Sequence, residues 1–271
     1  MGPPLTASLW SCAEIINIAQ HNNSDTKKQM LVLSGKTERT GRHMSWIKYF
    51  ILSSPGRKLV MSLTGLFLIL FLVIHLAGNL QLLVDDGGEA FNTYAYLMTH
   101  NPVIRIISLG LYFFILVHAI QGIVIWVQNL RARPHKYAVG HYPEASFVAK
   151  QMVLLGILIF AFLCLHLKDF WYKMKFTDTL ALRQYTPYTP EVKDLYIPVD
   201  IAFHSPWIVI AYLVGLLALA VHLWHGFGSA FMTLGLTHKR YGFLFHWIGR
   251  GYAILVPLGF AIIPLYIFFF R

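Results

Sequence analysis

The stretch that decides the fold is residues 56–83, "GRKLVMSLTGLFLILFLVIHLAGNLQLL". After Arg57 and Lys58 it contains no Lys, Arg, Asp or Glu, and leucine, isoleucine, phenylalanine and valine dominate it. A helix needs about 20 apolar residues to cross a hydrocarbon core, and this run exceeds that length. It therefore predicts a membrane-spanning helix at 57–84 with His75 inside it.

The whole chain has the composition of a membrane protein. Of its 271 residues, 56% are apolar and 13% are charged, whereas an ordinary soluble domain has roughly 25% charged residues. Two cysteines, Cys12 and Cys164, are too few for a disulfide framework or a thiolate zinc site. The net charge of +10 comes from Lys and Arg residues that cluster between apolar segments, which is typical of membrane orientation rather than nucleic-acid binding.

Four further segments are long and apolar enough to span a membrane. We therefore expect an all-α polytopic bundle of five transmembrane helices. The predicted spans are 57–84, 103–130, 147–172, 205–234 and 245–270.

The distribution of charge predicts the orientation of these spans. Basic residues gather before the first span, between the second and third, and between the fourth and fifth: Lys48, Arg57, Lys58, Arg131, Arg133, Lys136, Lys150, Lys239, Arg240 and Arg250. Loops rich in Lys and Arg stay in the cytoplasm. The loop after the first span instead carries Asp85, Asp86 and Glu89. We expect a cytoplasmic N-terminus and a C-terminus outside.

Residues 1–43 differ from the rest of the chain. They are polar and irregular after a short apolar stretch that contains Glu14. Because that stretch lacks a preceding positive segment, it is not typical of a secretory signal. We expect a mobile extension, or a segment upstream of the functional start, ahead of a membrane domain at 44–271, and we assign it no function.

Four histidines lie inside the predicted spans: His75, His118, His166 and His222. An ionisable residue in a membrane helix is costly and indicates function by default, although a hydrogen bond to a neighbouring helix is the structural alternative for any single one. At about 1.5 Å per residue, His75 and His166 lie near the outer ends of their helices, and His118 and His222 lie deeper. The depths predict two pairs separated by roughly 12–15 Å along the membrane normal.

The local sequence repeats the inner pairing. The second span contains "HAIQG" at 118–122 and the fourth contains "HLWHG" at 222–226. Gly122 and Gly226 therefore follow their histidines by about one turn on the same face, where a flat macrocycle can approach the backbone. Plain helix packing is the alternative role of such glycines.

Two further glycines and one further histidine complete the pattern. Gly65 and Gly156 each precede the histidine of their own span by ten residues. His225 is the alternative ligand to His222, from which it is displaced by about 4.5 Å along the helix and about 60° around it. The spacing to the following glycine favours His222. A swap of the two ligands stays open, and His225 otherwise bonds a propionate, a carbonyl or a neighbouring helix.

Paired histidines on facing helices are a common way to hold haem iron in a bundle core. A neutral imidazole is a good ligand for a transition metal. We therefore predict two b-type haems with two axial histidines each, and no covalent attachment, because the sequence contains no C-x-x-C-H. Zinc is less favoured, since four histidines at two levels do not converge on one tetrahedral site.

The segment at 56–83, together with "ILVHAIQGIVIW" and "VHLWHGFGSAFMTLG", resembles the cytochrome b558 membrane-anchor subunit of succinate dehydrogenase and fumarate reductase, in its single-subunit, dihaem, five-helix form. The likeness covers most of 44–271. It implies electron transport in a succinate:quinone oxidoreductase of the tricarboxylic acid cycle, located in the bacterial cytoplasmic membrane. The implied partners are a flavoprotein and an iron–sulfur subunit on the cytoplasmic side, and the implied substrate is quinone, with menaquinone favoured.

The resemblance also assigns the ligands. It implies that His75 and His166 hold the distal haem iron and that His118 and His222 hold the proximal one. No G-x-G-x-x-G motif follows a predicted strand, so dicarboxylate and flavin chemistry is expected in a partner subunit.

Two other functions remain as alternatives. A dihaem anchor of a nitrate reductase or hydrogenase would share the histidine pattern and differ in its soluble partner. A proton-coupled transporter would more typically have Asp or Glu partners in its spans and discontinuous helices. The cores of these spans hold almost no carboxylates, which favours a cytochrome.

Overall fold

The computed structural model describes residue 50 and residues 52–131, 147–187, 190–236, 240 and 242–271. The chain divides into two compact units, Met1–Leu52 and Ser53–Arg271, and the second contains the elements described below. The expectation for residues 1–43 falls outside the described residues.

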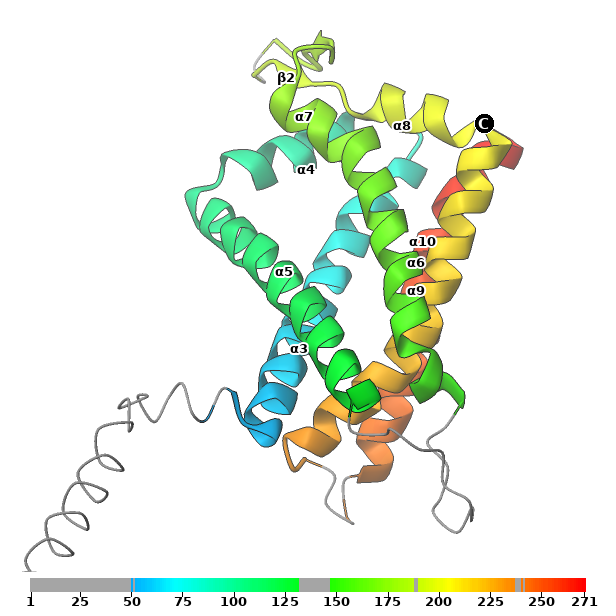
Figure 1. The fold of residues 1–271 in the computed structure, drawn as a ribbon. Helices are drawn as coiled ribbons and strands as arrows, with labels where there is room; N and C mark the ends of the chain where they lie inside the picture. The colour runs from blue at the N-terminus through cyan, green and yellow to red at the C-terminus, as the bar shows by residue number, and fades with distance from the viewer. Residues whose placement is uncertain (1–49, 51, 132–146, 188–189, 237–239, 241) are drawn as a thin grey trace, which may run out of the picture. The chain divides into compact units, whose positions relative to one another are not determined.

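Five long helices make up most of the second unit (Figure 1). Each is long and apolar enough to cross a membrane. The predicted all-α architecture with five such helices is therefore confirmed, and each predicted span corresponds to one helix, extended in the case of the third by the short segments that follow it. The long helices are α3 (Ser54–Asn79), α5 (Pro102–Arg131), α6 (Phe147–His166), α9 (Pro206–Thr233) and α10 (Gly242–Phe270).

Local sequence signals set several helix ends. Ser53 precedes α3 in an extended conformation, and its hydroxyl accepts a hydrogen bond from the Gly56 amide at 3.2 Å, as an N-cap residue does. Pro206 opens α9, where its missing N–H has no intrahelical partner to lose. Gly235 follows α9 with a φ of +71°, a left-handed conformation that favours glycine and ends the helix.

The connection from α3 to α5 is more ordered than the sequence indicated. It contains a 3₁₀ helix, η1 (Leu80–Leu83), and a short helix, α4 (Glu89–His100). Between them Gly88 has a φ of +92°, and a Cβ placed on it would collide with the Tyr196 ring. Both the backbone conformation and the close approach require glycine there.

The chain between α6 and α9 also contains short elements that the sequence did not predict. After α6 the chain continues through a π-helical segment, η2 (Leu167–Tyr172), and α7 (Lys173–Phe176). The short strands β1 (Leu182–Arg183) and β2 (Val192–Lys193) then pair antiparallel, and the helix α8 (Tyr196–Phe203) leads into α9.

One buried side chain ties these connections together. Asn92 of α4 is fully buried and donates to the Asp194 carboxylate at 2.9 Å. Its carbonyl oxygen accepts from the Leu195 and Tyr196 amides at 3.0 and 3.1 Å. A buried amide with all these partners fixes the two connections against each other.

Helix α9 is central to the packing. It lies along α10 over most of its length (Figure 1) and also contacts α6 and α3. Helix α3 packs against α5, whereas α5 and α6 touch only slightly. No residue of α5 is buried in the described structure. The most tightly buried apolar cluster lies where α4, η2, α8 and the adjoining ends of α9 and α10 meet, around Phe91, Phe170, Phe203, Tyr212 and Ile267.

Candidate functional site

The first histidine pair joins α3 to α6. The ring centres of His75 and His166 lie 5.7 Å apart, and the ring planes are almost perpendicular. His166 is the last residue of α6, immediately before the π-helical segment η2. We refer to His75 and His166 as the outer pair.

The second pair joins α5 to α9. The ring centres of His118 and His222 lie 6.2 Å apart. The ring that faces His118 in this pair is therefore that of His222, and His225 lies one turn further along α9. We refer to His118 and His222 as the inner pair.

The two pairs occupy different levels of the bundle. A Cβ on Gly65 of α3 would lie 3.3 Å from Cε1 of His118, so α3 meets the inner pair at residue 65. His75 follows ten residues later on the same helix, which corresponds to about 15 Å along the axis. The structure thus places the four histidines in the same two pairs that we predicted from their depths in the membrane spans.

The separation within each pair fits one metal ion between two imidazoles. A bond of about 2 Å from a transition metal to each nitrogen puts the two ring centres on opposite sides of the ion at about 6 Å. Edge-to-face ring contacts cover the same range of distance. The hydrogen bonds of the ring nitrogens therefore carry more information than the distance does.

Thr64 contacts the ring of His118. Its Oγ1 lies 3.1 Å from Nδ1 of His118 and also lies within 2.8 and 3.1 Å of the Val60 and Met61 carbonyl oxygens. When the single hydroxyl proton points to a carbonyl, Nδ1 of His118 donates to Oγ1 and Nε2 retains the lone pair. A hydrogen bond from the remote ring nitrogen is typical of metal-binding histidines.

Asn79 holds His75 differently. The side-chain Nδ2 of Asn79 donates to the His75 carbonyl at 2.8 Å and lies 3.3 Å from Nδ1 of the same histidine. An amide nitrogen is a donor and not an acceptor, so Nδ1 of His75 is the acceptor in this contact and a neutral ring then carries its proton on Nε2. Ligation of a metal through Nε2 would require Nδ1 to be released from Asn79.

The other member of each pair has a ring nitrogen without a partner. Within the described residues, Nδ1 of His166 and Nδ1 of His222 are buried and make no hydrogen bond. An unsatisfied buried polar atom costs about 1–3 kcal/mol, which a fold retains at sites that serve a function. Both pairs thus combine a histidine contacted by a polar side chain of α3 with a histidine whose Nδ1 is unpaired.

Aromatic side chains enclose the outer pair. The ring centres of Phe71 and Phe260 lie 5.1 and 5.5 Å from that of His75. Phe170 and Tyr212 lie 5.6 and 6.2 Å from His166. An apolar shell of this kind lowers the local dielectric and disfavours charge on either imidazole.

Two unpaired oxygens lie close to that shell. Among the described residues, the Tyr212 hydroxyl and Oδ2 of Asp169 are buried without a hydrogen-bond partner. Tyr212 contacts the His166 ring, and Asp169 lies in η2, three residues after His166. The sequence indicated no role for either of these two residues.

The glycines near the inner pair differ in their surroundings. A Cβ on Gly226 would meet nothing within 4 Å, and one on Gly122 would meet Cε of Met61 at 3.5 Å. The glycine that touches a ligand candidate is Gly65, which the sequence associated with His75 only through its spacing. A macrocycle beside Gly122 and Gly226 stays a prediction.

The histidines stand as pairs and not as larger clusters. Across the described ranges, no three His, Cys, Asp or Glu side chains converge on one point. The arrangement offers two nitrogens at each of two levels, which suits axial ligation of a planar macrocycle that supplies its own equatorial nitrogens.

The sequence analysis did not identify the two polar partners of the histidines, Thr64 and Asn79. Both are polar residues in an apolar segment, eleven positions before and four positions after His75. The i, i+4 spacing from His75 to Asn79 places both on one helix face. The contact between Thr64 and His118 depends on how α3 packs against α5, which no local pattern encodes.

Comparisons with known proteins add no assignment to this geometry. No family model, no curated protein and no solved structure matches the chain.

Proposed function

We propose that this chain is a dihaem cytochrome b that anchors a respiratory oxidoreductase in the membrane and carries electrons between an iron–sulfur subunit and quinone. The observation that carries the proposal is the presence of two facing histidine pairs, with ring centres 5.7 and 6.2 Å apart, at two levels of one apolar bundle. A single such pair is compatible with ordinary packing. Two pairs on four different helices are much harder to explain in that way.

The residues of this chain would hold and tune two b haems. His75 and His166 would be the axial ligands of one iron, and His118 and His222 those of the other. Haem supplies reversible one-electron chemistry when bound. With Nδ1 of His118 donating to Thr64, Nε2 would be available as a ligand and the ring would be a stronger base, while the aromatic shell of the outer pair would exclude water.

The low burial of α5 agrees with such a group. This helix is apolar on all sides, yet none of its described residues is buried, and it touches α6 only slightly. Helices of a membrane bundle normally associate through close van der Waals packing. A planar group between the histidine-bearing helices would supply contacts that the side chains of α5 do not make with the neighbouring helices.

Charge supports the proposed orientation. The described residues carry basic side chains at both ends of the helices, and the described Asp and Glu residues all lie at the end where α3 and α10 finish. The proposed orientation therefore rests on the short connections of the sequence at the other end, which hold Arg131, Arg133, Lys136, Lys150, Lys239 and Arg240. The positive-inside rule puts short connections rich in Lys and Arg in the cytoplasm. The inner pair would face the soluble subunits and the outer pair would lie toward the other side of the membrane.

The proposed complex is a succinate:quinone oxidoreductase with menaquinone as its favoured quinone. This part of the proposal rests on the resemblance of the segments around His75, His118 and His222 to cytochrome b558 anchors. Moving one charge across the membrane changes its free energy by about 2.3 kcal/mol per 100 mV, so two redox groups about 15 Å apart along α3 would couple quinone chemistry to the membrane potential.

The decisive experiment is a visible absorption spectrum and haem determination on the purified chain. We expect two b haems per chain in the wild type and one in His118→Ala. The matched control is His225→Ala, which removes an imidazole one turn from His222 and should keep both haems. A colourless wild-type protein, or loss of a haem in the control alone, would contradict the proposal.

The soluble partner distinguishes a succinate:quinone oxidoreductase from another respiratory enzyme with a dihaem anchor. Purification of the tagged chain from its native membrane should bring down a flavoprotein with succinate:quinone activity. Recovery of a nitrate reductase or hydrogenase subunit would retain the haem assignment and overturn the choice of complex. Proton-coupled transport without any haem would overturn both.

A further inference from the structure

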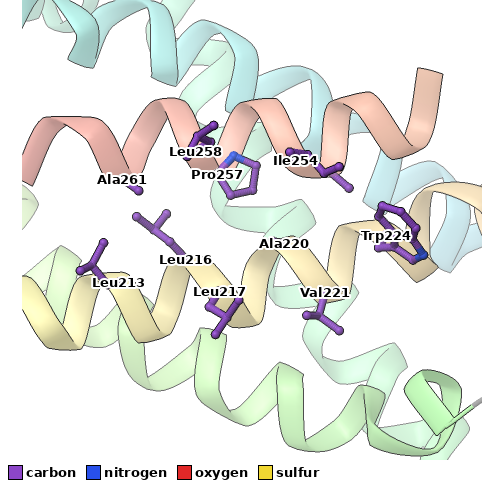
Figure 2. Close-up of a pocket in the computed structure, with 11 residues that line it drawn as sticks. Leu213, Leu216, Leu217, Ala220, Val221, Trp224, Ile254, Pro257, Leu258 and Ala261 are labelled. Atoms are coloured by element: carbon purple, nitrogen blue, oxygen red, sulfur yellow. The ribbon is translucent and has the colours of Figure 1, made fainter. Parts of the chain in front are cut away.

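An apolar groove lies on the side of α9 that faces away from the histidines. It runs between α9 and α10 and has a volume of about 480 Å³ (Figure 2). On α9 it is lined by Leu213, Leu217, Ala220 and Trp224, which repeat at i, i+4, i+7 and i+11 and so form one stripe. His222 points about 160–200° away from this stripe. The groove is therefore separate from the candidate haem ligands.

The facing stripe on α10 ends in a charge. Ile254, Pro257 and Ala261 line the groove (Figure 2). Arg250 lies one turn before Ile254 on the same face. The two helices run antiparallel, so Arg250 and Trp224 lie at the same end of the groove, as their contact confirms: the guanidinium carbon is 5.1 Å from the Trp224 ring centre.

Arg250 is held by aromatic rings. Its guanidinium stacks over Trp224 and also over Trp247, 5.5 Å from that ring centre. Among the described residues its Nε is buried and has no hydrogen-bond partner. A guanidinium inside a membrane helix is costly and marks a functional site by default. Contacts with ring faces stabilise the charge but use none of its five N–H donors.

We propose that this groove binds one anionic phospholipid, with an acyl chain along α9 and α10 and the phosphate on Arg250. The guanidinium fork matches the geometry of phosphate oxygens. Charge complementarity selects this occupant, because the surrounding end of the bundle carries Arg57, Lys58, Arg131 and Arg240 and no described Asp or Glu. Basic pockets between transmembrane helices are typical sites for anionic headgroups.

The groove lies in the middle of the two helices. The α9 stripe from Leu213 to Trp224 is about 16 Å long and is nearly central in Pro206–Thr233, so an acyl chain that starts at Arg250 would extend past the bilayer centre. Trp247 lies one turn closer to the start of α10 than Arg250 does, so a guanidinium stacked on it reaches toward the interface, as long basic side chains do near helix ends.

The test is native mass spectrometry of the purified full-length chain with phosphatidylglycerol or phosphatidylcholine of identical acyl composition. Wild-type protein should retain one phosphatidylglycerol and bind it about tenfold more tightly than phosphatidylcholine, which is the order expected for charge-assisted bonds. Equal affinity for the two lipids in the wild type would overturn the proposal without any variant.

Two matched pairs of substitutions locate the site. Arg250→Gln should lower the affinity for phosphatidylglycerol to that for phosphatidylcholine, whereas Arg131→Gln, which removes the same charge from an exposed position at the same end, should not. Ala220→Leu fills the groove and should weaken binding about as much, whereas Ala119→Leu at an exposed position of α5 should leave it unchanged.

The remaining outcomes are also decisive. An equal loss in Arg131→Gln and Arg250→Gln would mean that the headgroup is attracted by overall charge, and would overturn the site. Binding of a neutral long-chain quinone in place of the lipid, lost in Arg250→Gln, would assign the groove to quinone and overturn the lipid. If Arg250→Gln does not fold, Ala220→Leu compared with Ala119→Leu tests the groove instead, and equal binding by these two variants would overturn the site. Haem content should be unchanged in every variant, so failure of this proposal is distinguishable from failure of the proposed function.

Discussion

The inner and outer histidine pairs use the same residue type in two different environments. In the inner pair, Oγ1 of Thr64 lies 3.1 Å from Nδ1 of His118. In the outer pair, Asn79 contacts His75, and aromatic rings lie around both histidines, close to the most tightly buried cluster of the bundle. Both pairs therefore have a polar contact from α3, and the outer pair has an aromatic shell in addition.

The two kinds of environment control different properties of a metal-bound histidine. A hydrogen bond to the remote nitrogen controls the tautomer and the basicity of a ligand. Exclusion of water and low dielectric control the cost of a change in charge at the metal. If both pairs hold haem, we expect their reduction potentials to differ. Substitutions around the inner pair should act through hydrogen bonding to the ligand, and those around the outer pair through the exclusion of water.

The largest expected effect separates the two pairs completely. His75→Ala and His166→Ala should each remove the outer haem and leave one haem per chain, because an iron with a single protein ligand is poorly retained in an apolar shell. The double variant should lose no more haem than either single variant, since both act on one centre. Haem determination on the purified proteins checks this. Two haems lost in either single variant would show that the pairs are not independent.

The next effect tests the contact between α3 and the inner pair. A Cβ on Gly65 would lie 3.3 Å from Cε1 of His118, so Gly65→Leu should displace the ring and cost about 1–3 kcal/mol, seen as loss of most of the inner haem. Gly156→Leu is the matched control on α6, because a Cβ there meets nothing within 4 Å. The spectrum of each variant distinguishes the outcomes, and equal behaviour of the two would contradict the contact.

The five helices and the grouping of the histidines could be predicted because both follow from properties of the chain alone. Apolar length decides which segments span a bilayer. A fixed rise per residue converts position in a span into depth, so His75 and His166, or His118 and His222, could be matched without knowing how the helices pack.

What could not be predicted depends on tertiary contacts. Helices α4 and α8 are short, and they are held by interactions such as those of Asn92 with Asp194, Leu195 and Tyr196, which join residues about a hundred positions apart. Thr64 meets His118, and Gly65 approaches its ring, only because of the rotation of α3 against α5. We paired the glycines by their spacing to the histidines and therefore did not predict that Gly65 lies against His118.

A smaller effect is expected from the hydroxyl beside His118. Thr64→Val keeps the shape of the side chain but removes the hydroxyl that contacts Nδ1 of His118. We expect haem retention to weaken about 10-fold, the low end of the range for loss of a hydrogen-bond partner of a metal ligand. The reduction potential of the inner haem should rise, because its ligand becomes a weaker base. Thr64→Ser restores the hydroxyl and should behave as the wild type in redox titration. A potential that does not respond to Thr64→Val would remove the hydrogen-bonding half of the comparison.

The smallest effect is expected at Asn79, and it decides whether the two pairs truly differ. Its amide bonds mainly to the His75 carbonyl at 2.8 Å and lies 3.3 Å from Nδ1, so Asn79→Ala removes a positioning contact and leaves Nδ1 of His75 free to carry the ring proton. A net loss of about 0.5–1.5 kcal/mol is expected for one such bond, and the aromatic shell should still retain the outer haem. Redox titration should show a shift smaller than that of Thr64→Val at the inner haem. If the outer haem instead responds more strongly, the outer pair depends on hydrogen bonding as the inner one does, and the aromatic rings serve packing alone.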